Sequence, residues 1–400
     1  MLILADHNIP QIKSACSGLG EIRLFDSRDL VELRRLVPTA DVLLCRSTIR
    51  VDADLLAGTP VRFVATATSG TDHFDTAWLD AHGITHASAA GSNARSVAEW
   101  WVAVMLELQA RERISLDGAT SVGIVGVGHV GTQVADVACA MGMRCVYNDP
   151  PRERCGETPV SWSDVGFSSM EEILACDVVT LHVPLTREGG FPTAGFFGEG
   201  QFSLMHPGTV FVNAARGGVM EPAAVLRWAE RGNPVVLDVF PGEPRIDPAL
   251  VNVADIATPH IAGHAWDGKL RGTEMVAEAL RGWIRMEPGR RVSSDLDTSG
   301  HEDTKTQRHE NIEREHLPTI FRRDVYGEVL EVVRGVYDVR VDDAALRAAV
   351  EMDGEAAAAE FARLRAEYSV RREFAACDVN AAGLAPEAVK LLHALGLRLH

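Results

Sequence analysis

From Met1 to about Ala90, short aliphatic runs alternate with amphipathic stretches of helical length. The runs read LILAD, DVLLCR, RFVATAT and GITHAS. Apolar strands separated by helices are typical of a parallel sheet that is covered by helices. We therefore expect the chain to begin with a doubly wound α/β domain.

A long apolar-periodic segment follows from Asn93 to Arg113, and the asparagine at its expected N-cap predicts one helix that joins two domains. A second alternation of strands and helices begins just after it. Its apolar runs read SVGIVGVG, RCVYNDP, CDVVTLHVP, GTVFVNAARG, PVVLDVF and ADIATPH. This pattern predicts a second doubly wound parallel sheet, of Rossmann or flavodoxin type.

The remainder of the chain is less regular. Trp266 to Met286 has the pattern of a helix, whereas residues 297–311 contain no aliphatic side chain and indicate a solvated linker or insertion. The sequences VYDVRVDDAALR and EAAAAEFARLRAEYSVRREFAA follow, and the second is strongly helical. The predicted fold class is α/β, with two doubly wound parallel-sheet domains and a small C-terminal α+β domain.

Composition narrows the class of protein further. The chain has 400 residues, of which 46% are hydrophobic and 24% charged, and no apolar run approaches the ~20 residues of a membrane span. A formal net charge of -17 makes nucleic acid or an anionic membrane a poor partner. The seven cysteines form no C-x-x-C pair, and the N-terminus lacks the features of a signal peptide. We therefore expect a cytoplasmic protein without structural disulfides.

The segment VGIVGVGHVG places Gly126, Gly128 and Gly131 in a G-x-G-x-x-G pattern between a strand-like run and a helix. The first glycine allows a tight turn, the second lets a pyrophosphate approach, and the third permits close packing of helix on strand. Asp149 ends the next strand, where a carboxylate binds ribose hydroxyls and repels a 2'-phosphate. The pattern predicts NAD rather than NADP, although such glycines can also form only a turn.

Three polar residues follow predicted strands of the second sheet at their carboxyl ends, where ligands of open α/β sheets bind. They are Arg216 in VNAARGG, Glu243 in VFPGEP and His260 in ATPHIAG. An arginine can hold a carboxylate through two parallel hydrogen bonds, and an imidazole, which titrates near ~6.5, suits proton transfer. A glutamate can orient such a histidine and stabilise its cation. Together they predict oxidation of a 2-hydroxy acid.

His260 and His264 also offer a different interpretation, because two histidines four residues apart can bind a metal from one helix face. Pro259 and Gly263 disfavour a helix at this point, and the glutamate of the H-E-x-x-H zinc motif is absent. We therefore expect no metal here.

The segments VGIVGVGHVG, VNAARGG, LDVFPGEP and TPHIAG occur in the order and spacing of the D-2-hydroxyacid dehydrogenase family, which the chain resembles. The resemblance is closer to the branch that oxidises 4-phospho-D-erythronate with NAD in pyridoxal 5'-phosphate (vitamin B6) biosynthesis. It covers nearly the whole chain through segments such as ILADHNIP, LCRSTIRV, FVATATSGTDHFD, HIAGHAWDGKLRGT and LRAEYSVRREF. Other branches lack the third region, which mediates dimerisation in the resembled enzymes and implies a homodimer here.

This resemblance implies a division of the chain and roles for single residues. The implied domains are a substrate-binding domain (1–92 and 265–288), an NAD-binding domain (93–264) and a dimerisation domain (289–400). It makes Arg216 and Glu243 active-site residues, His260 the proton carrier, and Asp238 a contact of the nicotinamide end. The other implied cofactor residues are Gly126, Gly128, His129, Val130, Gly131, Asp149, Val183 and Gly263. The implied substrate residues are Arg46, Ser47, Thr68 and His264, and a further hypothesis is that Arg347 reaches a partner's active site.

Two residues depart from the pattern of this branch. His264 replaces the tyrosine that usually follows HIAG, and Val183 replaces a threonine that contacts the cofactor. Two alternative functions remain open. One is another D-2-hydroxyacid dehydrogenase, acting on phosphoglycerate, glycerate or hydroxypyruvate, and the other is a non-catalytic NAD-sensing binding protein.

Overall fold

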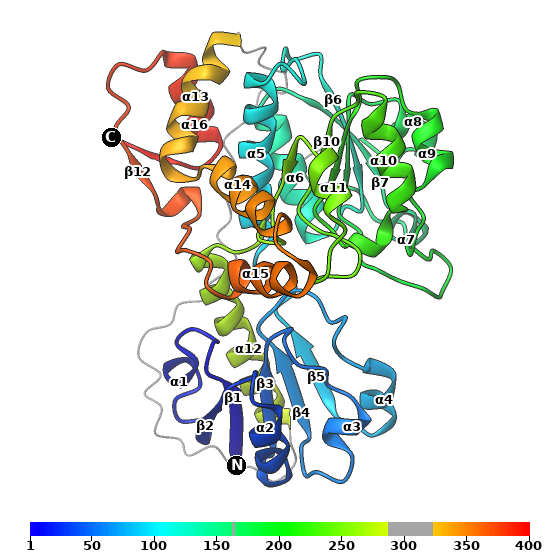
Figure 1. Cartoon of the computed structure of the whole chain (residues 1–400). Coiled ribbons are helices and arrows are strands. Elements are labelled where there is room, and N and C mark those ends of the chain that lie inside the picture. The colour runs from blue at the N-terminus through cyan, green and yellow to red at the C-terminus, as the bar shows by residue number, and fades with distance from the viewer. Residues whose placement is uncertain (162–164, 287–322) are drawn as a thin grey trace. The chain divides into compact units, whose positions relative to one another are not determined.

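The computed structural model describes residues 1–161, 165–286 and 323–400 (Figure 1). The predicted polar stretch at 297–311 lies outside the described residues. The long segment that was expected to be helical from Trp266 to Met286 forms helix α12 with these bounds, so that prediction is confirmed.

The described residues form two compact units. The first comprises Met1–Ala67, His73–Ser88 and the part of helix α12 that follows Gly272. The second comprises Thr68–Asp72, Ala89–Gly272 and the C-terminal region from residue 323 onward. The C-terminal region is thus packed into the same unit as the G-x-G-x-x-G segment.

The first unit is built on a five-stranded parallel sheet in the order β2-β1-β3-β4-β5. The central strands are buried, whereas both edge strands are partly exposed. Its strands are β1 (Leu2–Asp6), β2 (Glu21–Phe25), β3 (Val42–Cys45), β4 (Phe63–Thr66) and β5 (Thr85–Ser88). Its helices are α1 (Ile12–Ala15), α2 (Leu30–Leu36), η1 (Val37–Thr39), α3 (Ala53–Leu56) and α4 (Thr76–Ala81).

The second unit contains a six-stranded parallel sheet in the order β11-β10-β9-β8-β6-β7. Its strands are β6 (Ser121–Val125), β7 (Arg144–Asn148), β8 (Val178–Leu181), β9 (Val210–Asn213), β10 (Val235–Leu237) and β11 (Ile256–Ala257). Its helices are α5 (Ala94–Ala110), α6 (His129–Ala140), α7 (Pro150–Arg154), α8 (Met170–Leu174), α9 (Glu199–Leu204), η2 (Gly217–Val219), α10 (Pro222–Glu230) and α11 (Pro248–Val253). All six apolar runs predicted for this sheet form strands, and the fold class is confirmed.

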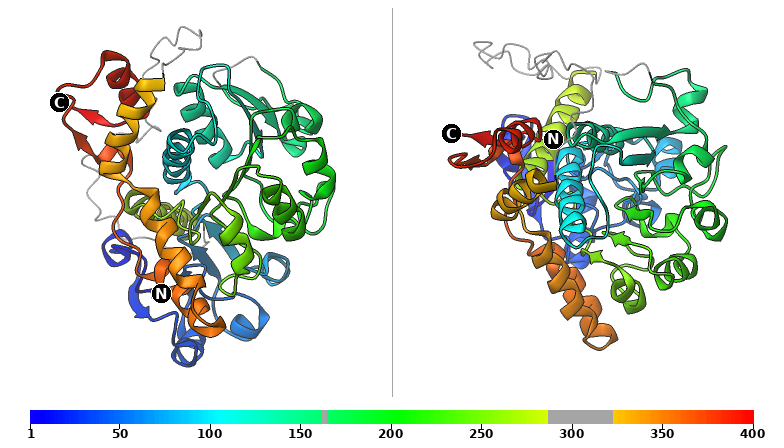
Figure 2. Two further views of the ribbon diagram at one scale, coloured as in Figure 1. Left: turned by 45° about the horizontal axis from the view of Figure 1, so that its top comes forward. Right: turned by 90° about the horizontal axis from the view of Figure 1, so that it is seen from above.

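The C-terminal region is mainly helical, with one short two-stranded parallel sheet. Its elements are α13 (Arg323–Val336), α14 (Val339–Val350), α15 (Gly354–Ala366), η3 (Phe374–Ala376), β12 (Asp378–Val379), α16 (Pro386–Ala394) and β13 (Arg398–Leu399). In Figure 2 the yellow and orange helices lie beside α5 (cyan), and α13 and α14 both contact it. Helix α5 carries Trp100 and Trp101, whose side chains are fully buried.

This region also covers an edge of the six-stranded sheet. Strand β11 is an edge strand, yet both of its residues are buried because α14 packs on it. The Asp343 side chain accepts a hydrogen bond of 2.8 Å from the Ala257 N–H, a strand-edge donor. An unpaired strand edge invites pairing with another chain. Asp343 therefore provides, within the same chain, an acceptor for an N–H group of this strand edge.

The end of α15 differs from the prediction. The sequence pattern continues as a helix to Ala376, whereas the structure ends the helix at Ala366. Arg371 forms a parallel bridge with Ala265, and its carbonyl accepts from the Trp266 N–H. These contacts require an extended chain, so tertiary pairing overrides the local helical preference.

Glu99 on α5 joins the C-terminal region through the Phe374 N–H, which donates to its carboxylate. Burial raises the pKa of Glu99 to about 7, although Arg95 and the Phe374 N–H act to lower it. The folded protein therefore holds this proton more tightly than the unfolded chain does. The resulting stability is fully present below pH ~4.5 and is lost as the pH rises through ~7, by up to about 3 kcal/mol.

We expect Glu99→Gln to remove this pH dependence while it keeps a side-chain oxygen for the Phe374 N–H. Thermal unfolding between pH 5 and 7.5 should show the wild-type midpoint falling more steeply than that of the variant. Parallel curves for the two proteins would mean that Glu99 does not titrate in this range.

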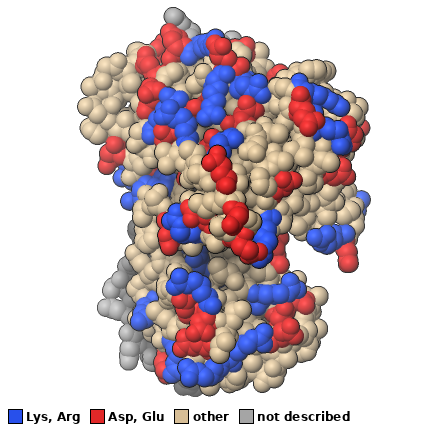
Figure 3. All heavy atoms as spheres, in the orientation of Figure 1, with Lys and Arg blue, Asp and Glu red and all other residues tan. Residues whose placement is uncertain are grey.

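The surface of the chain mixes both signs of charge. Figure 3 shows Lys and Arg interspersed with Asp and Glu over the face in view, so the excess of acidic residues is spread rather than gathered there. Within the described part of the chain, none of the helices combines the length and the apolar character that crossing a bilayer requires.

Candidate active site and family

The turn between β6 and α6 has the shape that dinucleotide binding requires. Gly126 adopts a left-handed φ of +85°, and a Cβ there would lie 2.8 Å from the carbonyl carbon and oxygen of His182. A Cβ at Gly131 would lie 2.1 Å from the Gly126 oxygen. Neither position has room for a side chain. By contrast, a Cβ at Gly128 would meet nothing within 4 Å.

Gly128, His129 and Val130 are the open part of this turn, at the N-terminus of α6. The open space beside Gly128 fits the approach of a pyrophosphate to the first N–H groups of the helix. Asp149 follows β7 and accepts a hydrogen bond of 2.8 Å from the Val127 N–H. The carboxylate expected to bind the ribose therefore lies against the glycine turn.

Alanine substitutions in the glycine turn should distinguish a residue that contacts the ligand from a residue that is packed in the fold. Gly128→Ala should leave the unfolding temperature unchanged and raise the Kd for NAD at least about tenfold, because the methyl group enters the space beside the turn. Gly131→Ala should weaken binding and also lower stability by about 1–3 kcal/mol through backbone displacement.

Calorimetric titration with NAD and thermal unfolding without NAD measure the two effects. Gly200→Ala is a suitable control, since a Cβ there also meets nothing and the residue lies on α9. Wild-type affinity in Gly128→Ala would contradict the proposed path of the pyrophosphate.

Arg216 follows β9 and is held from two sides. Its Nε and one terminal nitrogen donate to Asp72 at 3.0 and 2.8 Å, and its other terminal nitrogen donates to the Ala215 carbonyl. Both side chains are accessible, with Arg216 32% and Asp72 47% exposed. A Cβ on Gly70 would lie 2.1 Å from the guanidinium. The arginine is therefore oriented and able to exchange Asp72 for a ligand carboxylate.

His260 and Glu243 form a close pair at the ends of β11 and β10. The distance between His260 Nδ1 and Glu243 Oε2 is 2.6 Å. The other carboxylate oxygen accepts from the Phe240 N–H at 2.9 Å. With Nδ1 donating to the carboxylate, Nε2 is left as the ring atom that can accept a proton. The structure thus brings His260 and Glu243 together, and their roles as base and orienting carboxylate stay a prediction.

The environment of this pair favours an ionised glutamate. Burial alone would raise the pKa of Glu243, but the hydrogen bond from His260, the charge of His260, the Phe240 N–H and the charge of Arg365 lower it below its ordinary value. Arg365 lies on α15, with a terminal nitrogen 3.7 Å from Glu243 Oε2. A cation from the C-terminal region thus reaches the pair of His260 and Glu243.

The backbone of His260 is itself constrained. His260 has a φ of +56°, which a residue with a side chain rarely adopts, and its N–H donates to the Asp238 carbonyl at 2.7 Å. Strained backbone of this kind persists where surrounding contacts hold it, and often at functional sites. The Asp238 carboxylate accepts from Thr258 Oγ1 and from the N–H groups of Ile261 and Ala262. Asp238 therefore holds the histidine loop in shape.

Several predicted site residues have roles in packing. Gly263 leaves room for the side chain of Asn93, which a Cβ would approach to 2.2 Å. Val183 and His182 follow β8 beside Gly126, and burial lowers the pKa of His182 to about 3, so this ring is neutral. The ring of His264 lies edge-on to Tyr368 of the C-terminal region.

Arg347 has hydrogen-bond partners within its own chain. It donates to Asp343 on its own helix and to the carbonyls of Val251 and Ala254 at the end of α11. Its guanidinium joins α14 to α11 within one chain, which accounts for it without a ligand. The hypothesis that Arg347 reaches a partner's substrate therefore gains no support from its contacts.

The remaining substrate residues lie in loops. Arg46 and Ser47 follow β3 in the first unit, whereas Thr68 belongs to the short segment counted with the second. Among the described residues there is no group of three or more His, Cys, Asp or Glu side chains placed to hold a metal ion.

Comparison with known proteins gives the family. Residues 89–262 match the family model described as D-isomer specific 2-hydroxyacid dehydrogenase, NAD binding domain, and residues 323–396 match a domain of unknown function, DUF3410. Erythronate-4-phosphate dehydrogenase of Azotobacter vinelandii is 39% identical over 99% of both chains. The chain belongs to the erythronate-4-phosphate dehydrogenases. The same enzyme of Salinibacter ruber is 41% identical over 93% of this chain and 92% of its own.

Solved structures show that the erythronate-4-phosphate dehydrogenase family shares its fold with other dehydrogenases. NAD-bound 3-phosphoglycerate dehydrogenase of Entamoeba histolytica has a TM-score of 0.60, with 20% identity over 72% of this chain and 96% of its own. NAD-dependent formate dehydrogenase of Staphylococcus aureus has a TM-score of 0.57, with 22% identity over 73% of this chain and 98% of its own. The predicted family, fold class and NAD cofactor are confirmed.

Sequence reasoning missed two charged residues of this site. Asp72 lies in the segment FVATATSGTDHFD, but a single aspartate in a loop has no pattern of its own. Arg365 lies in an alanine-rich helix far along the chain from Glu243. Only the fold shows that they contact Arg216 and Glu243.

Proposed function

We propose that the protein catalyses the NAD-dependent oxidation of 4-phospho-D-erythronate to (R)-3-hydroxy-2-oxo-4-phosphobutanoate, a step of pyridoxal 5'-phosphate biosynthesis. The observation that carries this proposal is identity of about two residues in five with erythronate-4-phosphate dehydrogenases along nearly the whole chain, third region included. The paired His260 and Glu243 support a catalytic rather than a sensing role.

Each residue of the site has a defined part in this reaction. Arg216 binds the substrate carboxylate through two parallel hydrogen bonds in place of Asp72, and so orients the C2 carbon. His260 Nε2 takes the proton of the C2 hydroxyl as the carbonyl forms, and Glu243 stabilises the resulting imidazolium. NAD, where the glycine turn and Asp149 would hold it, would supply the acceptor for the hydride of C2. Atoms and charge balance with one proton on His260 and one hydride on the cofactor.

The site also needs a cation for the phosphate group. Arg46 is the residue we propose for this role, as the resemblance to erythronate-4-phosphate dehydrogenases implies. We further propose a cytoplasmic homodimer formed through the C-terminal region. Exposed apolar side chains there support an interface, namely Val341 (65% exposed), Val370 (73%) and Met352 (45%). Light scattering should give twice the mass of the 43.3-kDa chain.

An assay of the purified protein tests the proposed substrate. NADH formation is followed with 4-phospho-D-erythronate, with 3-phospho-D-glycerate and, in a parallel sample, with added 2-oxoglutarate. Activity on the erythronate ester alone is the expected result, and dependence on 2-oxoglutarate would show a retained cofactor. Preference for 3-phospho-D-glycerate would assign the protein to another branch of the family. If NAD binds but no substrate is turned over, the result would favour a binding protein.

A further inference from the structure

Arg365 lies beside the pair of His260 and Glu243, at the distance of an ion pair. One terminal nitrogen lies 3.7 Å from Glu243 Oε2, the oxygen that accepts from His260 Nδ1. Among the described residues, its Nε is buried without a hydrogen-bond partner. The side chain is only 30% exposed. Arg365 therefore acts on Glu243 by charge rather than as one half of a closed bidentate pair.

Aromatic side chains connect Arg365 to Glu243 and help to hold the arginine in position. Its guanidinium lies 5.9 Å from the ring of Phe361, one turn earlier on α15. Phe361 is 1% exposed and lies edge-on to Phe240, whose N–H donates to Glu243. The helix, the aromatic pair and the carboxylate thus form one connected arrangement.

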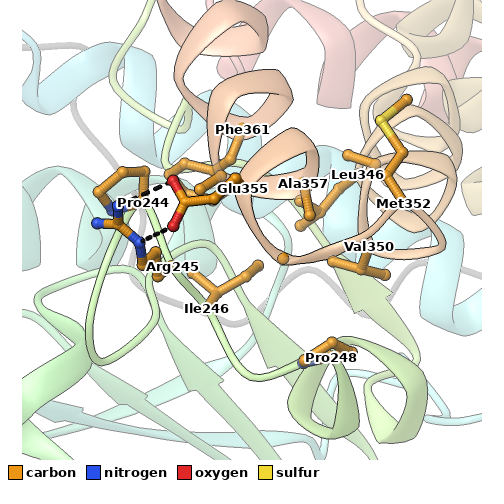
Figure 4. Close-up of a pocket in the computed structure, with 13 residues that line it drawn as sticks. Pro244, Arg245, Ile246, Pro248, Leu346, Val350, Met352, Glu355, Ala357 and Phe361 are labelled. Atoms are coloured by element: carbon orange, nitrogen blue, oxygen red, sulfur yellow. Dashed lines mark hydrogen bonds and ion pairs between the residues drawn. The ribbon is translucent and has the colours of Figure 1, made fainter.

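Helix α15 is anchored at its two ends by different means. At its start, Glu355 pairs with Arg245 beside a cavity of about 240 Å³ that Phe361 and Pro244 also line (Figure 4). Beyond its end, Tyr368 donates to Asp342, and Arg371 forms its bridge to Ala265. These anchors belong to the unit that contains the catalytic pair, so Arg365 does not depend on a second chain for its placement.

The charges around His260 explain why a cation is needed there. The carboxylate of Glu243 lies 2.6 Å from His260 Nδ1, and the buried carboxylate of Asp238 holds the same loop. A base in oxidation must be neutral before it takes the proton, so the balance of charge beside the ring affects when it can act. Arg365 faces the carboxylate of Glu243 from α15 and compensates part of its charge.

We propose that Arg365 is a positioning residue of the catalytic pair: its guanidinium keeps Glu243 ionised and in place, and opposes protonation of His260. The C-terminal region then sets the pH range in which oxidation occurs. The inference rests on the proposed oxidation and extends it to a residue outside the NAD-binding domain.

The test compares three full-length variants with the wild type. Arg365→Met removes the charge and keeps a side chain that packs on Phe361, Arg365→Lys keeps the charge, and Arg363→Met changes an exposed arginine of the same helix. The acidic limb of kcat/KM for 4-phospho-D-erythronate should move upward by about one pH unit in Arg365→Met. Arg365→Lys and Arg363→Met should keep the wild-type midpoint.

An unchanged midpoint in Arg365→Met overturns the proposal, whether or not kcat or KM changes. If that variant does not fold, Arg365→Gln takes its place. A measurement that needs no turnover tests the role of Arg365 independently of the proposed function. Histidine labelled with ¹³C at Cε1 gives a titration curve for His260, assigned by its loss in His260→Asn. In the NAD-bound protein, that curve should move upward in Arg365→Met even if the substrate assignment fails, and coincident curves reject the role of Arg365.

Discussion

Replacing His260 with glutamine is expected to lower kcat for oxidation by about 10²–10⁴-fold, the usual contribution of a positioned general base. Glutamine can approach Glu243 but cannot accept a proton at the hydroxyl. The binding of NAD should change by less than about twofold, because the glycine turn and Asp149 are untouched.

Stopped-flow measurement of NADH formation gives kcat, and titration of the free enzyme gives the Kd for NAD. His206→Gln is the matched control, since His206 is exposed in the loop before β9. Nearly wild-type turnover in His260→Gln would show that the proton leaves by another route.

Replacing Arg216 with lysine is expected to lower kcat/KM by about 100-fold or more, although the charge is kept. Lysine cannot make two parallel hydrogen bonds to a carboxylate, and a displacement of about 1 Å at the reacting carbon is enough to produce such a loss. Asp72 would retain an ion pair with the lysine, so the fold should be unaffected.

The loss should appear with hydroxy acids and not in the affinity for NAD. Arg227→Lys serves as control because Arg227 forms an exposed ion pair with Glu199 in the same unit. If Arg216→Lys retained the wild-type kcat/KM, the substrate carboxylate would have to be bound elsewhere.

The strands were predictable from the sequence where both faces of the sheet are covered. The runs that form β3, β4 and β6 are continuous and apolar, and all are buried. Edge strand β2 has no such run, since Glu21 and Arg23 face solvent, whereas the other edge strand, β5, was predicted. A half-exposed edge strand loses the apolar signal that marks a buried one.

The candidate site residues were predictable where a side chain suited to catalysis or binding follows the end of a strand. Arg216, Glu243 and His260 follow successive strands, and the structure brings His260 and Glu243 together. Asp238 also follows a strand, but its carboxylate holds the histidine loop, which depends on a turn that the sequence does not show. Arg365 reaches Glu243 through the packing of α15, whose Phe361 contacts Phe240. Tertiary contacts of this kind leave no periodic signal.

The C-terminal region thus has two connected roles in one chain. It covers the edge of the NAD-binding sheet, where Asp343 accepts from the Ala257 N–H, and it brings Arg365 to the carboxylate of Glu243. Loss of the region should therefore affect both stability and the chemistry of the site.

Transfer of deuterium from the substrate to the cofactor tests the central claim most directly. The enzyme is incubated with NAD and 4-phospho-D-erythronate labelled with deuterium at C2, and the reduced cofactor is analysed by mass spectrometry. We predict NADH that carries one deuterium and a product that has lost it. Reduced cofactor without deuterium, or deuterium retained in the product, would contradict hydride transfer from C2.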